Sequence, residues 1–149
     1  MKYKKFIIIG VGIVAVLLAV FTIWKTGDKT SSAPPIDAMQ KQFQAQSATE
    51  GSVTISATPM RIGDEWKIDL VFDTHSVELD QDLLANAALY DDASWEYRPV
   101  SWEGDQPGGH HRKGTLAFLG IRESTRTLTL VIKDIGGIPE RIFNWTVTK

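Results

Sequence analysis

All three histidines of the chain lie in one segment, together with several aspartates. His75 follows Asp73 at a spacing of two residues, and His110 and His111 come later, directly after a Pro-Gly-Gly turn. On an extended strand, side chains two residues apart point to the same side, so Asp73 and His75 should share a face. Imidazole nitrogens and a carboxylate are ligands that zinc and copper(II) accept. The pattern therefore predicts a divalent metal site.

Two further aspartates, Asp80 and Asp82, stand in the loop after His75 with the same two-residue spacing. With Asp73 they offer the carboxylate oxygens that calcium prefers, so calcium is a less favoured third metal. The spacing matches no established ligand signature, and the sequence lacks the EF-hand pattern. The candidate metal ligands are His75, His110, His111, Asp73, Asp80 and Asp82.

The same segment admits two other interpretations. Aspartate, serine and threonine side chains often hydrogen-bond loop amides, and the histidines could bond backbone carbonyls. These residues would then only hold loops in place within a protein-interaction or envelope-assembly domain. Alternatively, loops at one end of a β-sandwich can line a cleft. Trp95 and Trp102 would then form a ligand surface with the three histidines.

Catalysis is the least supported chemistry. Asp73, His75 and Ser76 supply the residue types of a hydrolytic triad. Close neighbours in sequence cannot generally align an acid, a base and a nucleophile, and the chain has no nucleophile-elbow motif. Paired carboxylates act as acid and base only at a suitable separation and pKa, which a sequence does not report. We predict no catalytic residue and no enzymatic activity, with an extracytoplasmic hydrolase as the weaker alternative.

The elements that position these residues come after an apolar N-terminal segment. Residues 6–24 carry no charge, and as a helix they would span about 28 Å, close to the thickness of a bilayer core. Three lysines precede them, which favours a cytoplasmic location for residues 1–5. A cleaved signal peptide is the alternative, but its apolar region would be shorter, and the nearest small-residue site, at residues 31–33, precedes two prolines. We predict one signal-anchor helix in the plasma or inner membrane, with the remainder outside the cytoplasm.

Length and composition limit the part of the chain beyond this helix. The chain has 149 residues and no cysteine, which suits one domain and excludes a disulfide scaffold, a thiol nucleophile and a Cys-based zinc site. Beyond Trp24 the chain holds all 18 acidic residues and 13 of the 16 basic ones, a formal charge of −5. Such a domain is compatible with cations and argues against nucleic acid, which requires a basic face.

Residues 25–50 are predicted to form a linker or stalk. The stretch 25–35 is small and polar and ends in two prolines, as linkers often do. Apolar residues then recur at helical spacing over 36–46, which favours a short helix, although an extended stalk fits as well.

From residue 51 onward, apolar residues alternate with polar ones, which is the period of a β-strand. The clearest runs are 53–58 and 66–73, and further runs lie at 86–90, 95–99, 116–118, 127–132 and 141–148. About seven strands with such turn spacing predict an all-β fold, an antiparallel immunoglobulin-like β-sandwich over 51–149, with a small β-barrel as the alternative. Within this region only residues 80–86 suggest a helical turn.

The segment from Phe72 to Phe118 resembles a pattern of uncharacterised bacterial and archaeal membrane-anchored domains. The similar pieces are Asp73-Thr74-His75-Ser76 with Leu79-Asp80, Pro99-Val100-Ser101-Trp102, and Gly108-Gly109-His110-His111-Arg112 with Gly114 and Leu116. They cover about a third of the chain. The resemblance implies an extracytoplasmic β-sandwich behind a signal anchor, and it implies no activity, cofactor or catalytic residue.

These observations predict a membrane-anchored binding module whose loop histidines and aspartates coordinate zinc or copper. Its expected partners are the membrane, through one spanning helix, and a protein of the cell envelope. Nucleic acid is not an expected partner.

Overall fold

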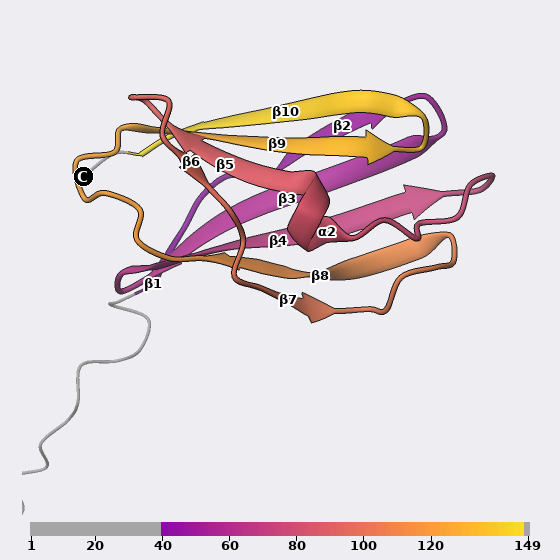
Figure 1. The fold of residues 1–149 in the computed structure, drawn as a ribbon, viewed down its shortest axis with the longest axis horizontal. Coiled ribbons are helices and arrows are strands. Elements are labelled where there is room, and N and C mark those ends of the chain that lie inside the picture. The colour runs from indigo at the N-terminus through magenta and orange to yellow at the C-terminus, as the bar shows by residue number, and fades with distance from the viewer. Residues whose placement is uncertain (1–39, 148–149) are drawn as a thin grey trace, which may run out of the picture. The chain divides into compact units, whose positions relative to one another are not determined.

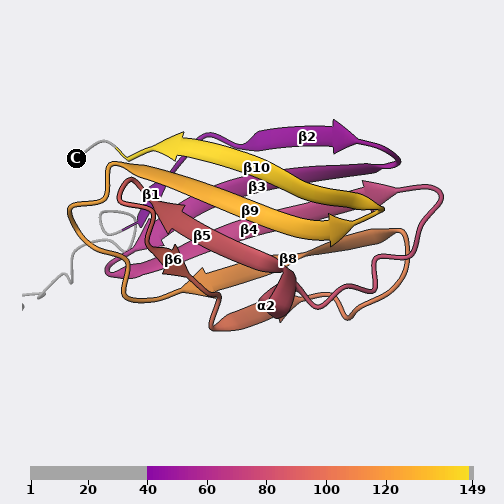
Figure 2. The ribbon, with the colours of Figure 1, turned by 45° about the horizontal axis from the view of Figure 1, so that its top comes forward.

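The structure, a computed structural model, describes residues 40–147, with only the backbone for 40–42. These residues form two antiparallel β-sheets packed against each other (Figures 1 and 2). The predicted anchor at residues 6–24 and the first part of the predicted linker lie outside the described residues. Within 40–147, no helix is long and apolar enough to span a membrane.

One sheet has six strands in the order β1-β3-β4-β8-β7, with β2 also pairing with β3. Its strands are β1 (Gln40–Gln42), β2 (Gln46–Glu50), β3 (Val53–Ile62), β4 (Glu65–Thr74), β7 (Ser101–Gly104) and β8 (His111–Phe118). The second sheet has four strands in the order β10-β9-β5-β6. They are β5 (Ala87–Asp91), β6 (Glu96–Tyr97), β9 (Thr127–Ile135) and β10 (Ile138–Thr146), and the helical turn α2 (Leu83–Asn86) precedes β5.

Alternating side chains create the core between the sheets. Every second residue at the start of β3 and along most of β4 is buried, and these side chains meet those of β5, β8, β9 and β10 in one apolar cluster. Each fully buried leucine, isoleucine or phenylalanine stabilises the fold by about 1.5–3 kcal/mol. The buried members of this cluster all lie between Val53 and Trp145, and residues 35–149 form one compact unit. We therefore expect residues 35–149 to fold without the preceding segment.

The predicted all-β, antiparallel class is confirmed, and so is the helical turn before β5. The structure adds short strands that alternation does not reveal, because they bury few apolar side chains. Two of them, β1 and β2, lie inside the predicted linker, where the apolar spacing favours a short helix. Residues 40–42 and 46–50 instead pair through their backbone with β3. Phe43, between these strands, stacks on Trp66 with ring centres 5.3 Å apart.

The sandwich has two ends, which we call the tip and the base. The base carries Gln40, the β3–β4 turn and Val147. Gln40 pairs with Ile62 at the end of β3, and Val147 N donates to Arg126 O just before β9. The tip carries the β2–β3 and β9–β10 turns and the ends of β4 and β8 that meet at His111. Ten-residue strands such as β3 separate the two ends by about 30 Å.

A buried arginine joins two turns at the tip. The guanidinium of Arg141 donates to Ile135 O in the β9–β10 turn at 2.8 Å and to Glu50 O beside the β2–β3 turn at 2.7 Å. Burial lowers the pKa of Arg141, but arginine remains charged at neutral pH. Two carbonyl dipoles therefore balance a cation that is shielded from water.

Replacing Arg141 should test this link. Arg141→Met leaves two carbonyls without their charged donor, so we expect a loss of about 2–4 kcal/mol in the free energy of unfolding. Urea unfolding of residues 35–149 measures it. The matched control is Arg98→Met, which removes an exposed arginine paired with Glu96 and should cost about 0–1 kcal/mol. Equal stability of the two variants would contradict the assigned role of Arg141.

Candidate functional site

The histidine loops lie side by side at the tip because the β4–β8 ladder continues beyond its strands. Asp73 on β4 is the register partner of His111 on β8. Past that pair, Thr74 N donates to His110 O at 2.9 Å, and Leu79 N donates to Gly109 O at 3.0 Å. Backbone pairing thus fixes the segment after β4 against the segment before β8.

Asp73, His75 and His111 form a cluster of exposed side chains. Nδ1 of His111 lies 3.4 Å from Oδ2 of Asp73, and the two side chains are 68% and 53% exposed. The rings of His75 and His111 meet edge to face, with centres 6.2 Å apart. Two imidazoles on one tetrahedral zinc ion would have ring centres about 5 Å apart. The observed separation is larger, so binding of one ion by both rings would require these exposed side chains to rotate.

The other candidate ligands make different contacts. Asp82 caps α2, where its Oδ1 accepts from Leu84 N at 2.9 Å. Asp80 Oδ1 accepts from the amide of Gln81 at 2.9 Å. His110 holds the ladder through its backbone carbonyl. Across residues 40–147, no three His, Cys, Asp or Glu side chains already stand as a ready metal cluster.

Arg112 organises the tip, although sequence patterning does not single it out. It is buried between the exposed residues His111 and Lys113, and its Nη1 donates to Leu79 O at 3.3 Å and to Gln81 O at 2.7 Å. Burial lowers the pKa of Arg112, while the carboxylates of Asp82, Asp105 and Asp80 oppose that shift. An arginine at an inward position of an alternating strand is the signal that could have identified it.

Trp102, a predicted member of the ligand surface, is partly buried and packs against the core. Its Nε1 donates to Asp105 O at 2.9 Å, and the guanidinium of Arg112 lies 5.2 Å from its ring centre. The ring covers two facing glycines, Gly104 and Gly114. A Cβ on Gly114 would stand 2.6 Å from Cζ2 of Trp102, so only glycine fits beneath the ring. These contacts assign Trp102 a packing role.

Trp95, the other predicted member, lies at the base. It follows β5, whose Asp91 pairs with Leu128 near the start of β9, and its side chain is 62% exposed. The guanidinium of Arg122 lies 5.7 Å from its ring centre. The length of the sandwich therefore separates Trp95 from the histidines, and a single cleft lined by all of them does not form.

A buried carboxylate organises the base. Asp91 accepts from Ala93 N at 2.9 Å, Trp95 N at 3.0 Å, the hydroxyl of Tyr97 at 2.9 Å and the guanidinium of Arg122 at 2.7 Å. Burial raises the pKa of Asp91, but these donors outweigh burial and hold the pKa below its usual value. The two amides and the tyrosine hydroxyl hold the β5–β6 turn together, and Arg122 ties that turn to the segment after β8. The role of Asp91 is therefore structural.

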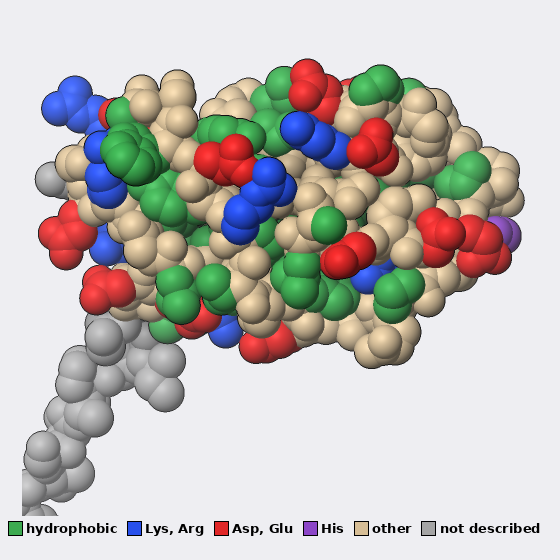
Figure 3. Space-filling model, in the orientation of Figure 1, with side chains coloured by type: hydrophobic (Ala, Val, Ile, Leu, Met, Phe, Trp, Pro, Cys, Tyr) green, Lys and Arg blue, Asp and Glu red, His purple; other side chains and the backbone are tan. Residues whose placement is uncertain are grey.

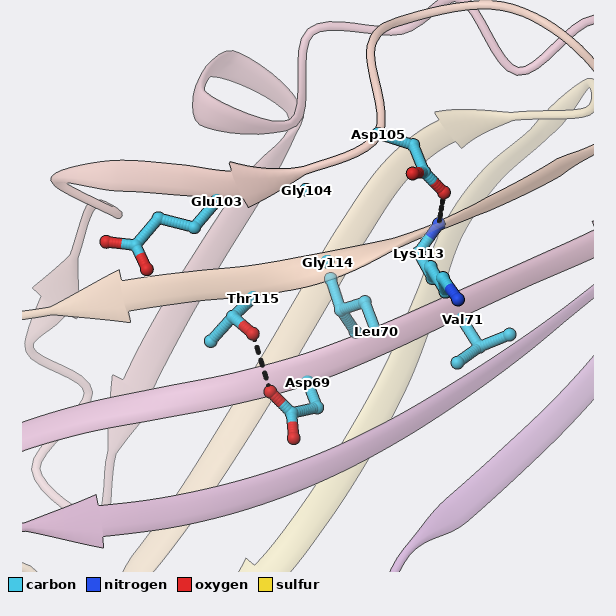
Figure 4. A pocket seen from close by; sticks show the side chains of 9 residues that line it. All are labelled: Asp69, Leu70, Val71, Glu103, Gly104, Asp105, Lys113, Gly114 and Thr115. Atoms are coloured by element: carbon cyan, nitrogen blue, oxygen red, sulfur yellow. Dashed lines mark hydrogen bonds between the residues drawn. The ribbon is translucent and has the colours of Figure 1, made fainter.

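The outer face of β4, β7 and β8 has an open depression of about 420 Å³ (Figure 4). Its lining includes no predicted site residue. The polar groups there are partly paired: Thr115 donates to Asp69 at 2.7 Å, and Lys113 N donates to Asp105 at 2.9 Å. Figure 4 shows these two contacts on separate sides of the depression, with Glu103 pointing away from both. We assign this surface no function.

Comparison with protein-family models, with curated proteins and with solved structures finds no match to this chain. The resemblance inferred from the segment between Phe72 and Phe118 therefore stays a prediction.

Acid should weaken the base through Asp91. Its folded-state pKa lies below the ordinary value of 3.8, so its contribution to stability is complete above about pH 5 and is lost as the pH falls through the folded-state pKa. Asp91→Asn should therefore be less stable than the unmodified domain at pH 7, and the difference should shrink below about pH 4. Urea unfolding between pH 2.5 and 7 measures it, and a difference independent of pH would contradict the assignment.

Proposed function

We propose that the chain is a single-pass, membrane-anchored extracytoplasmic binding module whose tip binds a divalent transition metal through His75, His111 and Asp73. The observation that carries the proposal is the approach of these three exposed side chains at the tip. Zinc or copper(II) suits them better than calcium, because two of the three donors are imidazole nitrogens. Three protein ligands would leave a coordination position open to water or to a ligand on a partner.

The course of the chain favours presentation of the tip. β3 begins at the tip. Without β1 and β2, the chain would therefore enter the domain beside the histidines. β2 runs antiparallel to β3, and β1 pairs at its far end, so the described chain starts at the base instead (Figure 1). The linker from the predicted anchor would therefore join the domain at the base, about 30 Å from the histidines.

We also propose that the sandwich is immunoglobulin-like. If β3 to β10 are named A, B, C, C′, D, E, F and G, the two sheets read A-B-E-D and G-F-C-C′, which is the strand order of immunoglobulin domains. β1 and β2 are then additions before strand A. The histidine segments become the B–C and D–E loops, and the B–C loop belongs to the end that binds antigen in antibody variable domains. This analogy supports binding at the tip, and the nature of the ligand follows from the histidine side chains.

A second function has an observation in its favour. The tip loops are already held without an ion, because Arg112 bonds three carbonyls and Glu78 accepts from Gly109 N at 2.8 Å. A prearranged tip of this kind suits a protein-interaction or envelope-assembly domain in which the histidines are structural. The two functions differ in what metal does to stability.

Metal titration distinguishes them. We expect zinc or copper(II) to stabilise residues 35–149 by about 2.7 kcal/mol at one hundred times Kd, a rise of roughly 10 °C in Tm. His75→Ala with His111→Ala should abolish the rise and leave the metal-free fold nearly intact. His110→Ala is the matched control and should keep it. Differential scanning calorimetry with chelator, zinc, copper(II) and calcium in turn measures all three proteins.

Two outcomes would contradict the metal site. One is an equal Tm in chelator and in every metal for the unmodified domain. The other is an equal metal response in the double variant and in the unmodified domain. A double variant that is less stable by the same amount with and without metal would favour the structural role of the histidines.

A further inference from the structure

We propose that a pocket at the base binds a phosphate-type oxyanion, either the free ion or the phosphate of a lipid headgroup. The pocket has a volume of about 400 Å³ and is lined by Ser124, Thr125, Arg126, Thr146 and Val147. It lies at the opposite end of the sandwich from the histidines and does not depend on the metal site.

Two segments distant in sequence build the pocket. β9 starts and β10 ends beside each other, since Thr127 is the register partner of Thr146. Val147 N then donates to Arg126 O at 2.7 Å, which extends the pairing past β10. On the other side, Thr125 N donates to Arg122 O at 3.1 Å and closes a turn. The pocket lies between this turn and the end of β10.

The lining chemistry suits an oxyanion. The lining residues carry one guanidinium and three hydroxyl groups, and a guanidinium can donate to two oxygens of a phosphate at once. Among the residues that the structure describes, no carboxylate lies within ion-pair distance of the Arg126 guanidinium. The neighbouring carboxylate of Asp92 instead accepts from the backbone amide of Arg126 at 2.9 Å, and this bond lowers the pKa of Asp92.

Thr125 gives an independent indication of a ligand. Thr125 is one of the residues that line the pocket, and the residue is only 4% exposed. Its Oγ1 has no hydrogen-bond partner in the described part of the chain. Buried hydroxyls without partners are rare because they lose their bonds to water and gain none in return. Because Oγ1 itself is closed to solvent, a bound oxyanion would supply the missing partner once the Thr125 side chain turned toward the pocket.

The surroundings of the pocket are compatible with a lipid source. Trp95 and Leu119 are exposed at the base, and Figure 3 shows Lys and Arg side chains at that end beside a hydrophobic patch, with acidic side chains among them. Exposed aromatic and cationic side chains are typical of the interface between membrane and water. The linker from the predicted anchor would also join the domain at this end.

Phosphate titration of residues 35–149 at constant ionic strength tests the site. We expect Tm to rise by about 5 °C at ten times Kd, and Arg126→Gln to lose that rise. Lys133→Gln, which removes an equal charge from β9 away from the pocket, should behave like the unmodified domain. Because phosphate also stabilises proteins by exclusion from their surface, the decisive quantity is the difference between variants.

Thr125→Val provides a second variant with a different signature. It removes the unpartnered hydroxyl, so stability without phosphate should stay equal or increase, whereas phosphate should bind several-fold more weakly. Isothermal titration calorimetry with inorganic phosphate measures the affinity. Equal phosphate responses of the unmodified domain, Arg126→Gln and Thr125→Val would overturn the proposal.

Vesicle sedimentation identifies the source of the phosphate group. Retention on phosphatidylglycerol vesicles but not on phosphatidylcholine vesicles, lost in Arg126→Gln and displaced by inorganic phosphate, would support a lipid headgroup. No retention on either vesicle, together with the phosphate-dependent rise in Tm, would support a free oxyanion. Retention that is unchanged in Arg126→Gln, without a specific phosphate response, would overturn the site.

Discussion

The antiparallel register between β4 and β8 determines what the tip of this domain can do. It pairs Phe72 with Arg112 on the inner face and Asp73 with His111 on the outer face. A slip of one residue would exchange the two faces, exposing the arginine and burying the histidine. The apolar side chains of β4 prevent that slip, because it would move the whole row from the core into water. The hydrophobic core thereby fixes the position of polar groups that are not part of it.

The two ends of the sandwich are held by buried charges of opposite sign. At the tip, Arg112 and Arg141 donate to backbone carbonyls of the surrounding loops. At the base, Asp91 accepts from backbone amides, a tyrosine hydroxyl and the guanidinium of Arg122. Each arrangement turns irregular loops into fixed surfaces without a long helix or a disulfide. Rigid loops of this kind can present a ligand site at little cost in conformational entropy.

Alternation of apolar and polar residues is sufficient to predict β3, β4, β9, β10 and the all-β class. It does not reveal β1, β2 and β7, because these short strands form through backbone pairing with a neighbour and their side chains carry little pattern. The spacing of Asp73 and His75 predicts a shared face, and both side chains do contact His111. That His111 rather than His110 faces them depends on cross-strand register, which a sequence does not contain. The separation of Trp95 from the histidines depends on the order of strands in the two sheets. The pocket beside Arg126 depends on two segments that share no sequence pattern.

The proposed metal site rests on the approach of two imidazoles and one carboxylate at the tip. The most direct measurement is the nitrogen NMR spectrum of the three histidine side chains in residues 35–149, recorded as zinc is added. We expect one imidazole nitrogen of His75 and one of His111 to shift together and saturate at one zinc per domain, while His110 stays unchanged. Three histidine spectra that do not respond to zinc, or that respond equally and without saturation, would contradict the site.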